Sequence, residues 1–147
     1  MTAFRISKVR RPPFDATGAR LVGGRWNSVG RAVVYASSFA GPILEILAHT
    51  TRPRTLPGPH HAVRIVIPDD LVETADDHRI GAWDRGPAAS RAFGDGWLDQ
   101  RRSAALSVPS LPARPVGRTI VIDPAHPDAD AIAVSEPFPV PRDDRLF

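Results

Sequence analysis

The chain has 147 residues, of which 42% are hydrophobic and 24% charged, a composition typical of one folded domain rather than of a disordered segment. Cysteine is absent, so the sequence offers no disulfide framework and no thiol chemistry, and a reducing cytoplasm suits it. No apolar run approaches the roughly 20 residues of a membrane span, and residues 1–8 lack the apolar core of a signal peptide. We therefore expect one cytoplasmic domain over residues 1–147 that makes no membrane contact.

The formal net charge is +3, and Lys8 is the only lysine, so nearly all basic residues are arginines. An arginine guanidinium is a planar fork that matches phosphates and carboxylates. The arginines do not gather in one stripe of the sequence, which disfavours nucleic acid as a direct partner. A phosphorylated small ligand or an acidic protein partner explains the net positive charge better than nucleic acid does.

The N-terminal half predicts two strands and one helix. The strands lie at residues 4–7 and 32–36, and a turn-rich segment over residues 18–24 lies between them. Ser37 or Ser38 caps the helix that follows. Its apolar face consists of Ile43, Leu44, Ile46 and Leu47. This is the main helix that the sequence predicts.

The C-terminal half predicts mostly strands. In chain order we expect a loop at 50–59, a strand at 61–67, a partly helical segment at 84–98, strands at 105–108, 119–122 and 131–134, and an extended proline-rich tail at 137–147. No internal repeat or second domain is visible. The pattern predicts an α+β fold with its main helix early in the chain.

Most familiar catalytic motifs are missing from the sequence. It contains no P-loop, no G-x-G-x-x-G, no G-x-S-x-G and no H-E-x-x-H. The histidines lack the spacing of zinc ligands, and a loop pair such as His60-His61 is usually exposed. We therefore expect neither metal catalysis nor a resident cofactor.

The segment from residue 23 to residue 30, Gly-Gly-Arg-Trp-Asn-Ser-Val-Gly, is the most distinctive in the chain. Glycines allow a backbone to approach a ligand closely, and Arg25 offers a bidentate grip on a phosphate. Tyr35, the only tyrosine, follows in the next predicted strand. Glu45 lies within an apolar helical stretch, where a carboxylate must be paired, hydrogen-bonded or functional. Together these residues predict a site for an anionic ligand.

Each of these residues also has a purely structural interpretation. Arg25 suits a surface ion pair, and Trp26 suits the core. Tyr35 suits a half-buried strand position, and Glu45 suits a solvent-facing position beside His49. For each residue taken singly, the structural interpretation is favoured. The hypothesis of function depends on the combination and order of the four residues.

That combination resembles the RES domain, the toxin half of RES–Xre toxin–antitoxin pairs. The matching segments are Phe4-Arg5, Gly24-Arg25-Trp26-Asn27, 33–37, 43–45, 94–98, 108–110, 122–128 and the tail over 137–146. The resemblance therefore covers nearly the whole chain. The ordered arginine, tyrosine and glutamate are its specific part, whereas Phe4-Arg5 and residues 108–110 are weak alone.

The resemblance implies an ADP-ribosyltransferase-like fold, in which a split β-core surrounds an NAD⁺ cleft. The arginine, glutamate and serine that give the family its name map to Arg25, Glu45 and Ser110, with Ser90 and Ser103 as alternatives for the serine. One departure is Asp123, where the family usually has asparagine. If that asparagine only shapes a turn, aspartate replaces it.

The resemblance also implies roles for the site residues. Those expected to act in the reaction are Glu45, Arg25, Tyr35 and Ser110, and those expected to bind NAD⁺ are Arg5, Arg25, Trp26, Asn27 and Tyr35. An arginine clamps the pyrophosphate, the tyrosine stacks on nicotinamide or ribose, and the serine orients ribose or amide. The glutamate stabilises positive charge that develops on the sugar.

The expected activity is therefore that of a toxin that uses NAD⁺ as substrate and cleaves its nicotinamide–ribose bond by hydrolysis or phosphorolysis. Transfer of ADP-ribose to a cellular protein is the alternative, and the sequence leaves the acceptor open. An Xre-type antitoxin is the expected protein partner. A non-catalytic RNA- or protein-binding module is the alternative from another class, although aromatic residues are only 7% and scattered.

Overall fold

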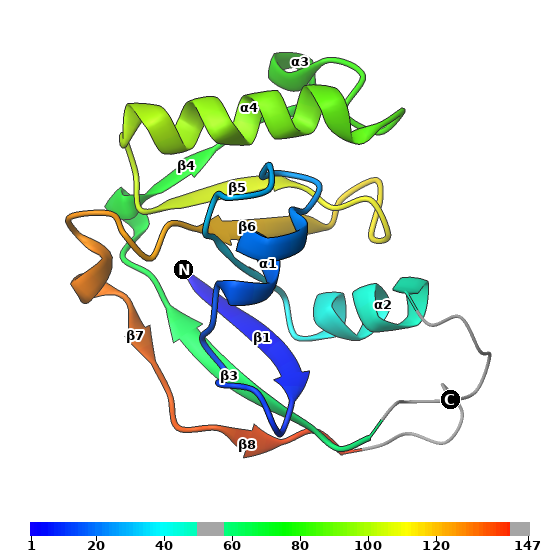
Figure 1. Ribbon diagram of the computed structural model, residues 1–147, viewed down its shortest axis with the longest axis vertical. Coiled ribbons are helices and arrows are strands. Elements are labelled where there is room, and N and C mark those ends of the chain that lie inside the picture. Colours follow the sequence, from blue (N-terminus) through cyan, green and yellow to red (C-terminus); the bar gives the residue numbers. More distant parts are fainter. Residues whose placement is uncertain (50–57, 142–147) are drawn as a thin grey trace.

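The computed structural model of the chain describes residues 1–49 and 58–141, and one eight-stranded sheet dominates it (Figure 1). The strands are β1 (Thr2–Lys8), β2 (Val34–Ser37), β3 (His60–Val66), β4 (Val72–Thr74), β5 (Ala105–Pro109), β6 (Arg118–Ile122), β7 (Ala133–Val134) and β8 (Phe138–Pro139). Their order is β4-β5-β6-β2-β1-β3-β7, with β8 also paired to β3. Among these described pairs only β4–β5 is parallel.

The sheet consists of two halves that meet at a single registered pair of residues. Strand β2 pairs with β6 at four positions, and β1 pairs with β3 at seven. Between β1 and β2 the register contains only Phe4 opposite Ser37. In Figure 1 the two halves run at a steep angle to each other, with α1 and α2 beside the junction. This arrangement confirms the predicted α+β fold with a split β-core.

Four α-helices occur in the described residues: α1 (Thr17–Val22), α2 (Ala40–His49), α3 (Asp77–Ile80) and α4 (Pro87–Gln100). Helix α2 confirms the predicted early helix. Helix α4 is longer and runs unbroken through Gly94 and Gly96, although the sequence predicted this region as only partly helical. No described helix has the length and apolar character that crossing a bilayer demands.

Two apolar clusters cover the two faces of the sheet. In β6, Ile120 and Ile122 belong to one cluster and Val121 to the other, as the alternation of side chains along a strand requires. Helix α4 covers the second face beside β5 and buries Trp97 there (Figure 1). The strands are thus fixed in register by burial on both faces.

Several segments differ from the sequence-based prediction. The stretch predicted as turn-rich over 18–24 contains α1, and the strand predicted at 131–134 shrinks to β7 after a 3₁₀ turn at Ala129–Ala131. Neither β4 nor α3 was predicted. The proline-rich tail contributes β8, while its residues 142–147, and residues 50–57 of the predicted loop, lie outside the described residues.

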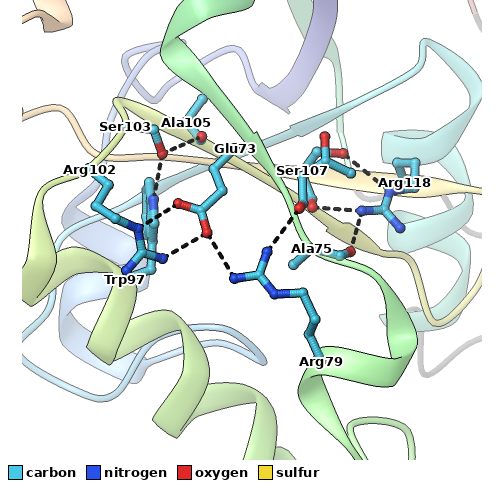
Figure 2. A network of polar contacts seen from close by, with 10 residues as sticks. Glu73, Ala75, Arg79, Trp97, Arg102, Ser103, Ala105, Ser107 and Arg118 are labelled. Carbon is cyan, nitrogen blue, oxygen red and sulfur yellow. Dashed lines mark hydrogen bonds and ion pairs between the residues drawn. The ribbon is translucent and has the colours of Figure 1, made fainter.

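A network of polar contacts ties β4 to α3 and to the α4–β5 connection (Figure 2). The carboxylate of Glu73 accepts hydrogen bonds from Arg102 Nε at 3.0 Å and Nη2 at 2.7 Å, and from Arg79 Nη2 at 3.3 Å. The bond from Arg102 is the main reason that the pKa of Glu73 lies below its ordinary value, and Arg79 lowers it further. This network holds the edge of the sheet.

Candidate active site

A cleft of about 1150 Å³ lies where the two halves of the sheet meet. Residues from β1, β2, α1, α2 and α4 line it. Five residues of the predicted site are in the lining: Arg5, Arg25, Trp26, Tyr35 and Glu45. The structure therefore brings together side chains that are up to forty residues apart in the sequence.

The glycine–arginine loop (residues 23–31) forms one wall of the cleft. Gly23 has a φ of +74°, a conformation that side chains disfavour. At Gly24 a Cβ atom would lie 2.4 Å from the hydroxyl oxygen of Tyr35, so only glycine fits. The two glycines thus let the backbone pack directly against the tyrosine.

The hydroxyl of Tyr35 joins β2 to this loop. It donates a hydrogen bond to Asn27 Oδ1 at 2.6 Å and accepts one from the backbone nitrogen of Trp26 at 3.1 Å. Burial is the main cause that raises the pKa of Tyr35 to about 12. The hydroxyl therefore keeps its proton at neutral pH and serves as a donor.

Two of the residues predicted to bind NAD⁺ lie deeper than expected. Asn27 is fully buried behind the cleft lining and donates to the carbonyls of Ala19 and Arg31, each at 2.9 Å. Trp26 is only 2% exposed and stacks on Trp83 with ring centroids 6.0 Å apart. Both residues shape the loop, and Trp26 also contributes to the lining of the cleft.

The two predicted arginines are held by backbone carbonyls. Arg5 donates to the carbonyls of Tyr35 at 3.2 Å and Asp15 at 3.1 Å, and Arg25 donates to that of Trp83 at 2.9 Å. Burial is the main cause that lowers the pKa of Arg5, and its buried Nε has no partner among the described residues. Carbonyl contacts orient a guanidinium without neutralising its charge, so both cations remain available to an anion.

Glu45 is the only acidic residue in the described lining of the cleft. Its side chain is 44% exposed, and Oε2 lies 3.5 Å from Nε2 of His49, one helical turn further along α2. This long contact to an exposed histidine leaves the carboxylate accessible. Glu45 therefore lies beside His49, as the sequence predicted, and its carboxylate is also accessible from the cleft.

Arg91 on α4 also lines the cleft, and sequence reasoning missed it. Its Nε donates to the carbonyl of Gly24 at 2.7 Å. The sequence surrounds Arg91 with no distinctive motif, and arginine is common in this chain. Only the packing of α4 against the glycine–arginine loop identifies it.

Comparisons with known proteins identify the family. Residues 2–143 match the RES domain family. The chain belongs to the RES domain family. Over 125 residues it is 41% identical to the Prs ADP-ribosylating toxin of Sphingobium sp., an alignment that covers 80% of this chain and 76% of that protein. It is 33% identical over 149 aligned residues to a Toxin Res of Pseudomonas putida, which covers both chains completely.

A solved structure shares the fold of this RES domain. It is that of the M. tuberculosis MbcT–MbcA toxin–antitoxin complex, which superposes with a TM-score of 0.75 over 95% of this chain and 83% of that one. The sequence identity is 18%, so the likeness concerns the fold.

Ser110 of the RES domain lines a different cavity from the other predicted site residues. It lines a second cavity of about 350 Å³, together with Trp83 and Arg114, and is not in the lining of the cleft. The alternative serines have internal partners, since Ser90 donates to the carbonyl of Pro87 and Ser103 donates to that of Ala105. The structure therefore does not join a candidate serine to Arg25 and Glu45.

Asp123 takes the position where the RES family usually has asparagine. Its Oδ1 accepts a hydrogen bond from the backbone nitrogen of Ala125 at 2.9 Å, which is an Asx turn. An aspartate oxygen performs this role as well as an asparagine oxygen does. The substitution therefore preserves the turn.

The described part of the chain contains no group of three or more histidine, aspartate or glutamate side chains arranged to hold a metal ion. The ring of His60 contacts the carbonyl of Gly58 at 3.0 Å, and that of His61 contacts the hydroxyl of Ser7 at 2.9 Å. The adjacent histidines therefore have separate partners.

Proposed function

We propose that this RES domain is the toxin of a toxin–antitoxin pair and that it cleaves the nicotinamide–ribose bond of NAD⁺ in the cleft. The arrangement of charge is the observation that carries the proposal. Arg5, Lys8, Arg25 and Arg91 line the cleft, while Glu45 is its single described carboxylate. NAD⁺ needs this combination, because its pyrophosphate is anionic and its reacting ribose becomes cationic.

The size and walls of the cleft support a dinucleotide as the ligand. Pockets for small molecules commonly measure about 300–1000 Å³, and this open cleft measures about 1150 Å³. Tyr35 adds aromatic surface to its wall. An extended ligand with two ring systems and two phosphates fits such a space.

In the proposed reaction the bond between the nicotinamide nitrogen and C1′ of the ribose breaks. Its electron pair leaves with nicotinamide, which departs as a neutral molecule and needs no general acid. Glu45 stabilises the oxocarbenium-like sugar and accepts a hydrogen bond from a ribose hydroxyl. In hydrolysis, water then adds to C1′ and releases a proton, giving ADP-ribose.

Transfer of ADP-ribose to a protein is the second candidate function. The relative that is 41% identical is named as an ADP-ribosylating toxin, which favours this alternative. Both reactions share the first bond cleavage and differ in the acceptor at C1′. Inorganic phosphate is a third acceptor for the same intermediate.

We also propose an antitoxin of the Xre type as the partner that holds this toxin inactive. The solved structure with the shared fold is itself a toxin–antitoxin complex, which supports a partner of this kind. The Xre class is what the resemblance to RES–Xre toxin–antitoxin pairs implies.

Nicotinamide release from NAD⁺ by the purified protein tests the proposed reaction. Glu45→Gln is expected to slow release by about 100- to 1000-fold, the typical loss of one electrostatic stabiliser. Glu136→Gln is the matched control, because Glu136 is exposed and outside the cleft lining. Release at the same rate from Glu45→Gln as from the wild type would refute the role of Glu45.

The acceptor is identified in the same reaction from the fate of the ADP-ribose. Free ADP-ribose indicates water, a phosphorylated ADP-ribose that requires added phosphate indicates phosphorolysis, and label retained on a protein indicates transfer. Each product is separable by mass spectrometry.

A further inference from the structure

The arginines of the cleft lack the ion pairs that hold four arginines elsewhere in the described structure. Arg5, Arg25 and Arg91 each donate to backbone carbonyls. In contrast, the arginines that form ion pairs with described carboxylates all lie outside the cleft lining, namely Arg31, Arg79, Arg102 and Arg114. The cleft therefore has cations that the described protein orients but does not neutralise.

Arg91 uses only part of its guanidinium for this support. Its Nε donates a hydrogen bond at 2.7 Å to the carbonyl of Gly24, the residue before Arg25. Among the described residues, the two terminal nitrogens of Arg91 have no hydrogen-bond partner, and the side chain is half-buried in the cleft lining. A planar guanidinium held at one edge presents its remaining donors in a fixed direction.

The charge of Arg91 acts on the same group as the charge of Glu45. Burial is the main cause of the raised pKa of Tyr35, while the charge of Arg91 lowers this pKa and the charges of Asp95 and Glu45 raise it. Arg91 also lies near the Tyr35 hydroxyl in the structure, because its Nε binds the carbonyl of Gly24, and Gly24 packs against that hydroxyl. An anion bound by Arg91 would therefore lie near the ribose that reacts, without contacting the carboxylate of Glu45.

We propose that Arg91 is a direct ligand of the pyrophosphate of the substrate and a determinant of its specificity for phosphorylated ligands. Nε fixes the carbonyl of Gly24, and the terminal nitrogens bind a phosphate oxygen beside Arg25. This assignment rests on the proposed function, because it takes the ligand of the cleft to be a dinucleotide.

A positioning role is the competing explanation, and the hydrogen bonds between Ser28 and Asp95 provide its control. Asp95 lies one helical turn after Arg91 on α4 and accepts hydrogen bonds from the backbone nitrogen of Ser28 at 3.0 Å and from its hydroxyl at 2.5 Å. It supports the same glycine–arginine loop but is not in the cleft lining. Ser28→Ala therefore weakens the support of the loop without changing any charge beside the cleft.

The test is calorimetric titration with ADP-ribose at several salt concentrations. Arg91→Gln is expected to weaken binding about ten- to a hundredfold, as loss of hydrogen bonds between charged groups does. It is also expected to flatten the salt dependence of the affinity, since one screened charge contact is gone. Arg91→Lys should retain most of the salt dependence and part of the affinity.

Ser28→Ala should keep the salt dependence of the wild type, and Arg85→Gln, which replaces an exposed arginine just before α4, should change neither quantity. Circular dichroism verifies that each variant is folded. The proposal is overturned if wild-type protein does not bind ADP-ribose, if Arg91→Gln binds within twofold of wild type, or if its affinity falls with unchanged salt dependence. Salt-sensitive binding that depends on Arg91, without nicotinamide release, would refute the proposed reaction and leave Arg91 assigned.

Discussion

At the scale of single residues, the Tyr35 hydroxyl links the strand that ends beside the cleft to the loop that carries Arg25. It satisfies Asn27 Oδ1 and the backbone nitrogen of Trp26 at once, and the missing Cβ of Gly24 makes room for it. Buried polar groups of this kind are costly to leave without partners. The tyrosine is therefore structural and part of the cleft at the same time.

The titration of Tyr35 checks this account directly. Because it is the only tyrosine, the tyrosinate absorbance of the folded protein reports this residue alone. We expect a midpoint at about 12 rather than near the ordinary value of 10.0. A midpoint near the ordinary value in a folded protein would contradict the buried, hydrogen-bonded hydroxyl.

The sign of the linked stability follows from the raised pKa. The folded state favours the neutral hydroxyl, so its contribution is complete below the ordinary pKa of 10.0 and is lost as the pH rises towards about 12. Tyr35→Phe is expected to lose about 1–3 kcal/mol of unfolding free energy at neutral pH. The difference from wild type in chemical denaturation should shrink over that alkaline window.

At the scale of elements, α4 is the support of the glycine–arginine loop. Arg91, Gly94 and Asp95 lie on one face of the helix, at the three- and four-residue spacing of neighbouring turns. Arg91 and Asp95 hydrogen-bond to the loop, and Gly94 lets the backbone of Trp26 approach. Gly94 would weaken α4 as an isolated helix, but the packing of α4 against the backbone of Trp26 requires a glycine at this position.

Alanine at the two glycines of α4 separates helix propensity from packing. A Cβ at Gly94 would lie 1.8 Å from the carbonyl oxygen of Trp26, whereas a Cβ at Gly96 would meet nothing within 4 Å. Gly94→Ala is expected to destabilise the protein by about 1–3 kcal/mol and to weaken ADP-ribose binding. Gly96→Ala should stabilise it by about 0.5–1 kcal/mol. Equal effects of the two substitutions in urea denaturation would contradict the proposed packing.

The ion pairs of Glu73 at the β4 edge make the stability of the protein depend on pH in the acidic range. Its pKa is lowered in the folded state, so the stabilisation is complete above its ordinary value of 4.5 and is lost as the pH falls through the lowered value. The arginine side chains are 50% and 46% exposed, and screening limits the contribution to on the order of 1 kcal/mol. The stability difference between wild type and Glu73→Gln should therefore vanish in strong acid, and a constant difference would refute the assignment.

The sequence predicted most long elements because their apolar residues recur with a clear period. The strands around residues 63 and 121 bury these residues, whereas in the early helix only Gly41 is buried. It did not predict β4 or α3, which are three and four residues long and depend on contacts with distant segments. Arg25, Tyr35 and Glu45 were found because their order is distinctive. Arg91 required knowledge of which helix face packs on the loop.

At the scale of the whole molecule, the cleft follows from the way the sheet is built. The two halves share one registered residue pair and run at a steep angle to each other (Figure 1), and the cleft at their junction is lined in part by α1 and α2. Four cationic side chains and one carboxylate gather in that space. A basic chain without a basic stripe thus places four of its cationic side chains around one cleft, as a small anionic substrate requires.

A single-turnover reaction, with protein in excess over NAD⁺, tests the central claim most directly by following bound NAD⁺ and free nicotinamide together. Wild-type protein is predicted to bind NAD⁺ and release nicotinamide. Glu45→Gln should bind it within a few fold of the wild-type affinity and release nicotinamide at least about a hundredfold more slowly. NAD⁺ that stays intact on folded wild-type protein, or equal release by both proteins, would contradict the account.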